Sequence, residues 1–232
     1  MSERLELIAD QIKNGRGVAD VGTDHAYLPC SLLKRGYTGR IIGTDINVGP
    51  LNKAKRTLRE SGCEDKVGLI LCDGLEGVDT SAVDTVVVAG MGGDTVTGIL
   101  DRAKNRLVPD TRLILQPVTK PEILRYWLIN NGFHIVSELH VLENGTLYQT
   151  LVAEHGKDVC YLDSELFVGR YELIKDSGFF DRLINTHYKR FRDAVDGLGR
   201  TRRSGLEPWI KLLSGVSDEL AEMKRRHDEY CK

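Results

Sequence analysis

Acidic residues end three successive apolar runs in the first third of the chain. Asp20 opens the segment Asp20-Val21-Gly22-Thr23-Asp24-His25-Ala26, and Asp45 and Asp73 follow the next two runs. In doubly wound sheets, ligands lie across the carboxyl ends of the strands. A carboxylate at the second strand end can accept both hydroxyls of a ribose, and one at the third is placed to accept a hydrogen bond from an adenine amino group. Because such a site needs no phosphate, the three acids favour S-adenosylmethionine over NAD.

The turn after the first run departs from the glycine pattern of dinucleotide-binding proteins, G-x-G-x-x-G. Gly22 lets the backbone approach a cofactor closely, but Asp24 stands where many methyltransferases carry a second glycine. A carboxylate there would repel a pyrophosphate and would tolerate a sulfonium and an amino group. The alternative interpretation is that Asp24 and His25 only cap the helix over 27–34, since aspartate is a favoured capping residue.

A glycine cluster, Gly90-Met91-Gly92-Gly93, ends the fourth apolar run. At this strand end of a methyltransferase sheet, the chain faces the methyl group and the incoming substrate. Glycines there leave room for a flat base to approach the sulfonium. The plainer interpretation, a tight turn from strand to helix, is compatible with the first.

A parallel sheet is needed to bring these residues to one edge. Up to about residue 156 the chain alternates strand-like runs with helix-like stretches, which is typical of a parallel sheet with helices on both faces. The predicted strands are 17–22, 40–45, 67–72, 83–89 and 112–116, and the predicted helices include 27–34, 49–60, 95–106 and 121–131.

The end of this region predicts a hairpin. Runs 133–142 and 146–153 flank Glu143-Asn144-Gly145, and Asn-Gly between two strands is a strong hairpin signal. A plain dinucleotide fold should end in another parallel crossover. We therefore predict an α/β fold with a class I, Rossmann-like methyltransferase sheet that ends in an antiparallel hairpin.

The last third of the chain changes to helical periodicity. From Asp163 onward, apolar residues recur every three or four positions in two stretches, 184–198 and 209–230. This spacing predicts two helices folded back as an antiparallel coiled-coil hairpin, with His227 packed in the core. The segment between the helices carries Arg200, Arg202 and Arg203, which either form a solvated turn or contact phosphate. The predicted domains are residues 1–156, which bind the cofactor and catalyse, and residues 157–232, which are helical.

Composition sets outer limits on function. The chain has 232 residues, 41% hydrophobic residues and a net charge of −2, which is ordinary for a globular protein and gives no global sign of nucleic-acid binding. Its five cysteines form no C-x-x-C pair, so we expect reduced, mostly buried thiols, no metal site and a cytoplasmic location. The N-terminal stretch is an amphipathic helix pattern rather than a signal peptide. No apolar run approaches the roughly 20 residues of a membrane span.

Several motifs together resemble the bacterial tRNA adenine-22 N1-methyltransferases. They are Asp20-Val21-Gly22-Thr23-Asp24-His25-Ala26-Tyr27-Leu28-Pro29, Ala89-Gly90-Met91-Gly92-Gly93, Leu113-Ile114-Leu115-Gln116-Pro117, and the segment 124–133 with Leu124, Arg125, Trp127, Leu128, Gly132 and Phe133. The resemblance covers essentially the whole chain, and it departs at Val118, where we would expect Asn.

The resemblance implies S-adenosylmethionine as cofactor, tRNA as partner, and methylation of adenine N1 in the D-arm region. Neither a membrane nor an obligate protein partner is expected. In the combined interpretation, Asp24 and Asp94 are the catalytic candidates. The predicted cofactor-binding residues are Asp20, Gly22, Thr23, His25, Asp45, Asp73, Gly74 and Gly90. The predicted substrate-binding residues are Met91, Gly92, Gly93, Arg200, Arg202 and Arg203.

Three alternatives remain open from the sequence. The same fold could methylate a small molecule or a protein, which the weakly acidic catalytic domain permits. The chain could be a non-catalytic binding module, although the intact Asp20, Gly22, Asp45 and Asp73 argue against it. An NAD-dependent oxidoreductase is disfavoured by Asp24 and by the predicted hairpin.

Overall fold

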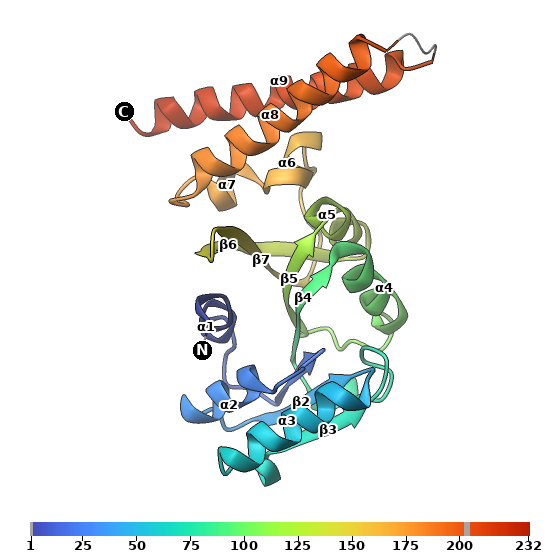
Figure 1. Cartoon of the computed structure of the whole chain (residues 1–232), viewed down its shortest axis with the longest axis vertical. Coiled ribbons are helices and arrows are strands. Elements are labelled where there is room, and N and C mark those ends of the chain that lie inside the picture. Colours follow the sequence, from blue (N-terminus) through green and yellow to red (C-terminus); the bar gives the residue numbers. More distant parts are fainter. Residues whose placement is uncertain (1, 202–204) are drawn as a thin grey trace. The chain divides into compact units, whose positions relative to one another are not determined.

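The computed structural model describes residues 2–201 and 205–232 and divides into two compact units, one ending at Asp158 and the other beginning at Val159. Arg202 and Arg203 of the predicted basic tip lie outside the described residues. Figure 1 shows both units in sequence colours.

The first unit is built on one mixed sheet. Within the described residues it holds seven strands in the order β3-β2-β1-β4-β5-β7-β6. The five strands from β3 to β5 pair in parallel, and β7 runs antiparallel to both β5 and β6. The strands are β1 (Gly17–Val21), β2 (Arg40–Asp45), β3 (Val67–Leu71), β4 (Thr85–Gly92), β5 (Arg112–Thr119), β6 (Phe133–Glu143) and β7 (Thr146–His155).

Helices cover both faces of this sheet, as the alternating pattern predicts (Figure 1). One group packs together as α1, α2 and α3, and α4 packs against α5. Buried Val18, Ile41, Val87 and Ile114 join Ile8 of α1 in one apolar core. The helices of this unit are α1 (Glu3–Asp10), α2 (Tyr27–Lys34), α3 (Val48–Glu60), α4 (Gly93–Ala103) and α5 (Pro121–Asn130), with short 3-10 turns η1 (Glu64–Lys66) and η2 (Thr80–Ala82).

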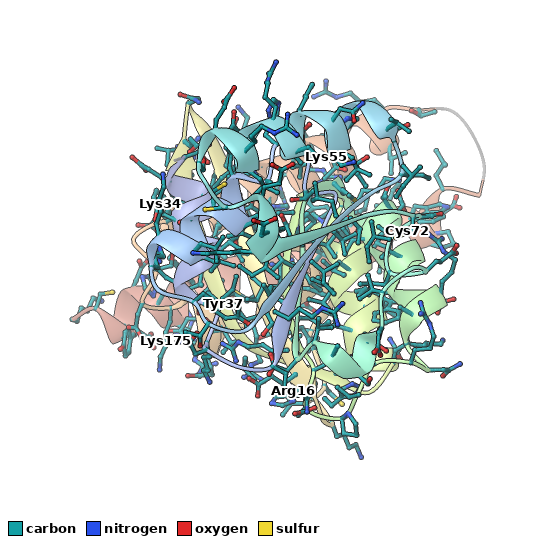
Figure 2. The ribbon with its side chains drawn as sticks, turned by 90° about the horizontal axis from the view of Figure 1, so that it is seen from below. Arg16, Lys34, Tyr37, Lys55, Cys72 and Lys175 are labelled. Atoms are coloured by element: carbon teal, nitrogen blue, oxygen red, sulfur yellow. The ribbon has the colours of Figure 1, made fainter. Side chains whose placement is uncertain are left out.

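The parallel strands bring their carboxyl ends to one edge. Figure 2 shows Cys72, just past β3, on the opposite side of the view from Arg16 and Tyr37, which precede β1 and β2. Strand order reverses between β2 and β4, the two neighbours of β1. Such a reversal opens a crevice at the carboxyl edge, where open α/β sheets bind ligands.

The predicted hairpin is present and is fixed by its turn. Asn144 has φ 49° and Gly145 has φ 80°, which is the conformation that a two-residue type I′ turn requires at both positions. Behind the turn, Arg125 of α5 is fully buried, and its guanidinium donates to Glu138 of β6 and Gln149 of β7. The Arg125 of the family motif therefore ties α5 to the hairpin.

Some element boundaries differ from the expected ones. Strand β1 ends at Val21, because Gly22 takes a positive φ of 73° and leaves the strand. Strand β4 runs on to Gly92, and α4 begins at once at Gly93 and ends at Ala103, before the expected Arg106. The glycine cluster is thus the end of the strand and the first helical residue, with no separate loop.

The second unit consists of helices. Phe191 of α8 and Val216, Leu220 and Met223 of α9 share one buried core. This agrees with the two predicted seams, the apolar residues that recur every three or four positions in 184–198 and 209–230. Tyr188, Trp209 and Tyr230, three other seam residues, are exposed. The helices are α6 (Asp163–Val168), α7 (Tyr171–Ile174), α8 (Phe180–Gly199) and α9 (Glu207–Tyr230), with α8 and α9 side by side and antiparallel (Figure 1).

His227 of α9 packs against aromatic rings but is only half-buried, so the prediction that it lies in the core holds in part. Its ring stacks on Phe180 with centroids 3.8 Å apart. The cysteine prediction was wrong in part: the described cysteines are free, but only Cys30 is buried, and Cys160 and Cys231 are exposed. Cys63 and Cys72 are half-buried. None of the described helices is long and apolar enough to cross a membrane.

Candidate active site

A cavity of about 490 Å³ opens at the carboxyl ends of β1, β2, β3 and β4. Clefts of this size are typical of small-molecule and cofactor sites. Seven of the predicted site residues line it: Gly22, Asp24, Asp45, Asp73, Gly74, Gly90 and Met91. The lining as described does not include Asp20, Thr23, His25, Gly92, Gly93 or Asp94.

Gly22 forms the floor of the cavity next to β1. Its N–H donates to the Thr44 carbonyl at 2.8 Å, which ties the turn to β2. A Cβ at this position would lie 2.3 Å from Cε of Met91, in addition to the strain of φ 73°. A side chain here would therefore have to displace Met91 and would strain the backbone, and glycine avoids both.

The segment after Gly22 is strained rather than a helix cap. Asp24 has φ 46° and Ala26 has φ 56°, a region that residues other than glycine rarely occupy. Residue Ala26 is the N-cap of α2, and no side chain caps that helix. The interpretation of Asp24 and His25 as capping residues is therefore wrong, and strain of this kind clusters at functional sites.

Asp24 presents its carboxylate at the cavity. Its Oδ1 lies 3.8 Å from Nζ of Lys53, and its Oδ2 lies 3.5 Å from Nε2 of His25. The ring of His25 stacks in parallel on Tyr27, with centroids 5.1 Å apart. His25 thus lies beside Asp24, outside the cavity lining.

Asp20, in β1, and Thr23, in the turn that follows, do not reach the cavity. Both are buried, at 7% exposure each. Burial raises the pKa of the Asp20 carboxyl to about 6, because desolvation disfavours the charged form. Asp20 therefore carries a proton more readily than an exposed aspartate.

Asp45 and Asp73 lie at successive strand ends, as the sequence predicts. The Asn47 N–H donates to Oδ1 of Asp45 at 2.9 Å, which orients that carboxylate. Asp73 accepts from Nη2 of Arg102 at 2.7 Å, and Nε of the same guanidinium lies 3.3 Å from Glu76. Gly74 packs so closely that a Cβ would lie 2.8 Å from Ile99.

The glycine cluster divides between the cavity and the sheet edge. Gly90, with φ 78°, lines the cavity, whereas a Cβ at Gly92 or Gly93 would collide with Thr119 or with the Lys120 carbonyl. Asp94 pairs with Lys120, so the second catalytic candidate is turned toward the end of β5. Val118 lies near the same end of β5, and its side chain is exposed.

Sequence reasoning missed nine residues of the lining, and Arg4 of α1 is the only charged one among them. Its Nη1 donates to Oε1 of the buried Gln116 at 3.2 Å, and its guanidinium lies over the Tyr148 ring at 5.6 Å. No local motif marks Arg4, because the contact joins residues more than 100 positions apart. The one signal in the sequence was the glutamine of Gln116-Pro117, a polar residue directly after three apolar ones.

The sequence is similar to those of known methyltransferases. A methyltransferase domain family matches residues 1–151. The tRNA (adenine(22)-N(1))-methyltransferase of Bacillus subtilis (strain 168) is 38% identical over 171 residues, which make up 73% of this chain and 71% of that protein. The chain belongs to the tRNA (adenine(22)-N(1))-methyltransferase family. The resemblance indicated by the sequence motifs is thereby confirmed.

Solved structures of tRNA (adenine(22)-N(1))-methyltransferases have the same fold. The Bacillus subtilis enzyme TrmK gives a TM-score of 0.87 at 28% identity, covering 96% of this chain and 98% of that one. The Streptococcus pneumoniae protein Sp1610, solved in complex with S-adenosyl-L-methionine, gives a TM-score of 0.76 at 29% identity, covering 96% and 99%. The sheet order and the closing hairpin are therefore those of this methyltransferase family.

Proposed function

We propose that this protein is an S-adenosylmethionine-dependent methyltransferase that methylates N1 of adenine 22 in tRNA, in the cytoplasm. Membership of the family carries the proposal, since the B. subtilis relative is named for this reaction. We assign the cofactor and the chemistry to residues 1–156 and a supporting role in tRNA binding to residues 157–232.

The residues at the cavity fit this cofactor. Asp45, oriented by the Asn47 N–H, offers a carboxylate for the ribose hydroxyls, and Asp73 offers one for the adenine amino group. Gly22 and Met91 line the same cavity, and a Cβ at Gly22 would collide with the Met91 side chain. Three carboxylates and no phosphate-binding glycine loop suit a nucleoside that carries a sulfonium.

S-adenosylmethionine supplies an electrophilic methyl group when bound. The protein's part is chiefly to hold the adenine ring in line with that methyl and to exclude water. Adenine N1 has a free lone pair at neutral pH, so no residue has to remove a proton before the attack. The base becomes cationic as it is methylated, and a carboxylate beside it stabilises that charge.

We assign this electrostatic role to Asp24. It lines the cavity beside Gly22, and its strained backbone is held in place by the surrounding turn. Lys53 is 3.8 Å away and exposed, so it neutralises the carboxylate only weakly. Asp94 is the second choice, because it pairs with Lys120 and does not line the cavity as described.

The target adenine must leave its stack, since N1 is used in base pairing. Flipping a base costs a few kcal/mol, which contacts elsewhere on the tRNA have to supply. Arg200 at the end of α8 is exposed and is a candidate for such contacts. Arg202 and Arg203, next to it in the sequence, are included in this proposal.

The deciding experiment is to incubate the protein with S-adenosylmethionine and unmodified tRNA, and to map 1-methyladenosine by mass spectrometry of nuclease fragments. We expect one modified adenine, at position 22, and none in a matched tRNA with guanine at that position. Methyl transfer to a small molecule or protein but not to tRNA would favour the first alternative. Cofactor binding without any transfer would favour a non-catalytic binding module.

A further inference from the structure

We propose that Arg4 binds the carboxylate of the methionine part of S-adenosylmethionine. This inference rests on the proposed cofactor and assigns a residue to the one anionic group that the cofactor carries. Arg4 comes from α1, whereas the rest of the lining comes from the ends of β1 to β4, the turns after them, α3 and α4.

The order of the strands places Arg4 at one end of the cavity. Asp73 follows β3, at the outer edge of the parallel strands, whereas Arg4 contacts Gln116 of β5, on the other side of β1 and β4. Arg4 is also close to Gly90, whose added Cβ would lie 3.9 Å from Nη1. In the cofactor, the carboxylate and the adenine are at opposite ends. With adenine at Asp73, the carboxylate lies toward Arg4.

Charge supports the same assignment. Among the residues that the structure describes, Arg4 is the only basic one lining the cavity, and the acidic ones are Asp24, Asp45 and Asp73. Those acids suit the hydroxyls, amino groups and sulfonium of the cofactor but repel its carboxylate. A guanidinium presents a planar fork of donors that matches a carboxylate.

The side chain is held in position before any ligand arrives. Gln116 accepts from Nη1 at 3.2 Å, Tyr148 lies under the guanidinium, and Oε2 of Glu143 lies 3.6 Å from Nε. These contacts engage Nη1 and Nε, and Nη2 makes no hydrogen bond to the described residues. Glu143 lowers the net positive charge at this place, but it also keeps a half-buried cation stable when the cavity is empty of anions.

The test compares two ligands on the full-length protein by calorimetry, without tRNA. The ligands are S-adenosylmethionine and its decarboxylated form, which keeps the adenosine, the sulfonium and the amino group. In the unmodified protein the carboxylate should strengthen binding. In Arg4→Gln, affinity for S-adenosylmethionine should fall about 10- to 100-fold, as expected for hydrogen bonds between charged groups. Affinity for the decarboxylated ligand should change less than about threefold.

Arg35→Gln is the matched control. Arg35, at the end of α2, pairs with Glu6 and Asp10 of α1, the helix that carries Arg4. The loss of Arg35 therefore loosens α1 without changing the charge at the cavity. We expect it to weaken both ligands equally, if at all. Arg4→Lys should retain part of the preference for the carboxylate, since it keeps the charge and loses the fork.

Two outcomes would overturn the inference. Arg4→Gln could weaken both ligands alike, which indicates a role in cavity structure. It could leave both affinities unchanged, which places the carboxylate elsewhere. In that second case, filter binding at several salt concentrations would show whether Arg4→Gln also flattens the salt dependence of tRNA binding. A flatter dependence would assign Arg4 to a phosphate of the substrate. A protein that binds neither ligand before mutation would instead refute the proposed cofactor.

Discussion

Nη2 of Arg102 lies 2.7 Å from Oδ1 of Asp73, so the carboxylate assigned to adenine is already half engaged by a cation from α4. Both side chains are 44% exposed, and ion pairs of this kind contribute about 0.2–1 kcal/mol. The pair orients Asp73 and leaves its other oxygen for the cofactor.

Substitutions at this pair should distinguish the residue that binds the cofactor, Asp73, from the residue that orients it, Arg102. Asp73→Ala should weaken S-adenosylmethionine binding at least about tenfold, because a charge-assisted hydrogen bond is lost. Arg102→Gln should weaken it less than about fivefold. Calorimetry on both variants, with Asp45→Ala as a reference for loss of the ribose contacts, measures this. Equal losses in the two variants would mean that Arg102 itself touches the cofactor.

Gly22→Ala should damage cofactor binding more than stability. An added Cβ would lie 2.3 Å from the Met91 methyl group. It would displace this side chain, which lines the cavity. Gly62→Ala is the matched control, since Gly62 also has positive φ, at 66°, but has no atom within 4 Å of an added Cβ. Both variants should lose about 1 kcal/mol of folding stability through backbone strain, and only Gly22→Ala should lose affinity.

Met91 provides a rescue experiment for the same idea. The double variant Gly22→Ala, Met91→Ala removes the methyl group that the new Cβ displaces. We expect it to regain most of the cofactor affinity lost in Gly22→Ala, as measured by titration calorimetry. If affinity stays low in the double variant, backbone strain and not crowding is the cause.

Asp24→Asn should lower the rate of methyl transfer at least about a hundredfold, because the charge facing the cationic base is lost. Asparagine accepts positive φ more readily than most residues, so the backbone at position 24 should keep its φ of 46° in the variant. Single-turnover assays with saturating cofactor and tRNA, alongside melting curves, test this. Asp94→Asn is the control and should stay within about threefold of the unmodified rate. The reverse order would make Asp94 the catalytic carboxylate.

The buried Asp20 and the half-buried His140 give the first unit opposing responses to acid. Burial, with a contribution from Arg125, lowers the pKa of His140 to about 4, so the unfolded chain binds more protons between pH 4 and 6.5 and stability falls as pH decreases. Burial raises the pKa of Asp20 to about 6, so the folded state binds more protons between pH 4 and 6, and this contribution falls as pH increases. Each is worth about 3 kcal/mol at most.

Asp20→Asn should therefore expose the His140 response. Urea unfolding of the cofactor-free protein at several pH values should show stability falling more steeply from pH 6.5 to 4 in the variant than in the unmodified protein. His140→Gln should have the opposite effect on the slope. Parallel curves for Asp20→Asn and the unmodified protein would mean that Asp20 titrates normally in the folded state.

Replacing Arg200, Arg202 and Arg203 with Ser should weaken tRNA binding and leave cofactor binding and melting temperature nearly unchanged. Each lost phosphate contact reduces the slope of log affinity against log salt by about 0.7–0.9. Filter binding at several salt concentrations measures the slope. Arg225→Ser is the control, since Arg225 is paired with Glu222 and Glu229. Identical slopes for the triple variant and the unmodified protein would make this segment a solvated turn.

Local patterns in the sequence predicted what depends on local chemistry. The strand ends at Asp45 and Asp73 followed from alternating runs, and the hairpin followed from Asn144-Gly145, whose positive φ values only a few residue types accept. The helical seams were correct where α8 and α9 bury residues such as Phe191 and Leu220. They failed at Trp209 and Tyr230, because periodicity does not tell how far the covering partner extends.

Distant contacts could not be predicted in this way. Arg4 reaches the cavity only because α1 packs beside β6, a contact between the two ends of the first unit. The pairing of Asp94 with Lys120 depends on where β5 ends beside α4. The backbone strain at Asp24 is likewise set by the turn as a whole, and a favoured capping residue was the simpler interpretation of the same letters.

The buried pair of Arg125 and Glu138 also determines which alignment of the closing hairpin can form. Successive strand residues face opposite sides of a sheet, so sliding β6 by one position would turn Glu138 away from α5. Arg125 would then be a buried cation without its counter-charge, at a cost of about 3–5 kcal/mol. Misaligned hairpins are thus disfavoured by charge, in addition to the loss of the apolar contacts that Phe133 and Ile135 make in the correct alignment.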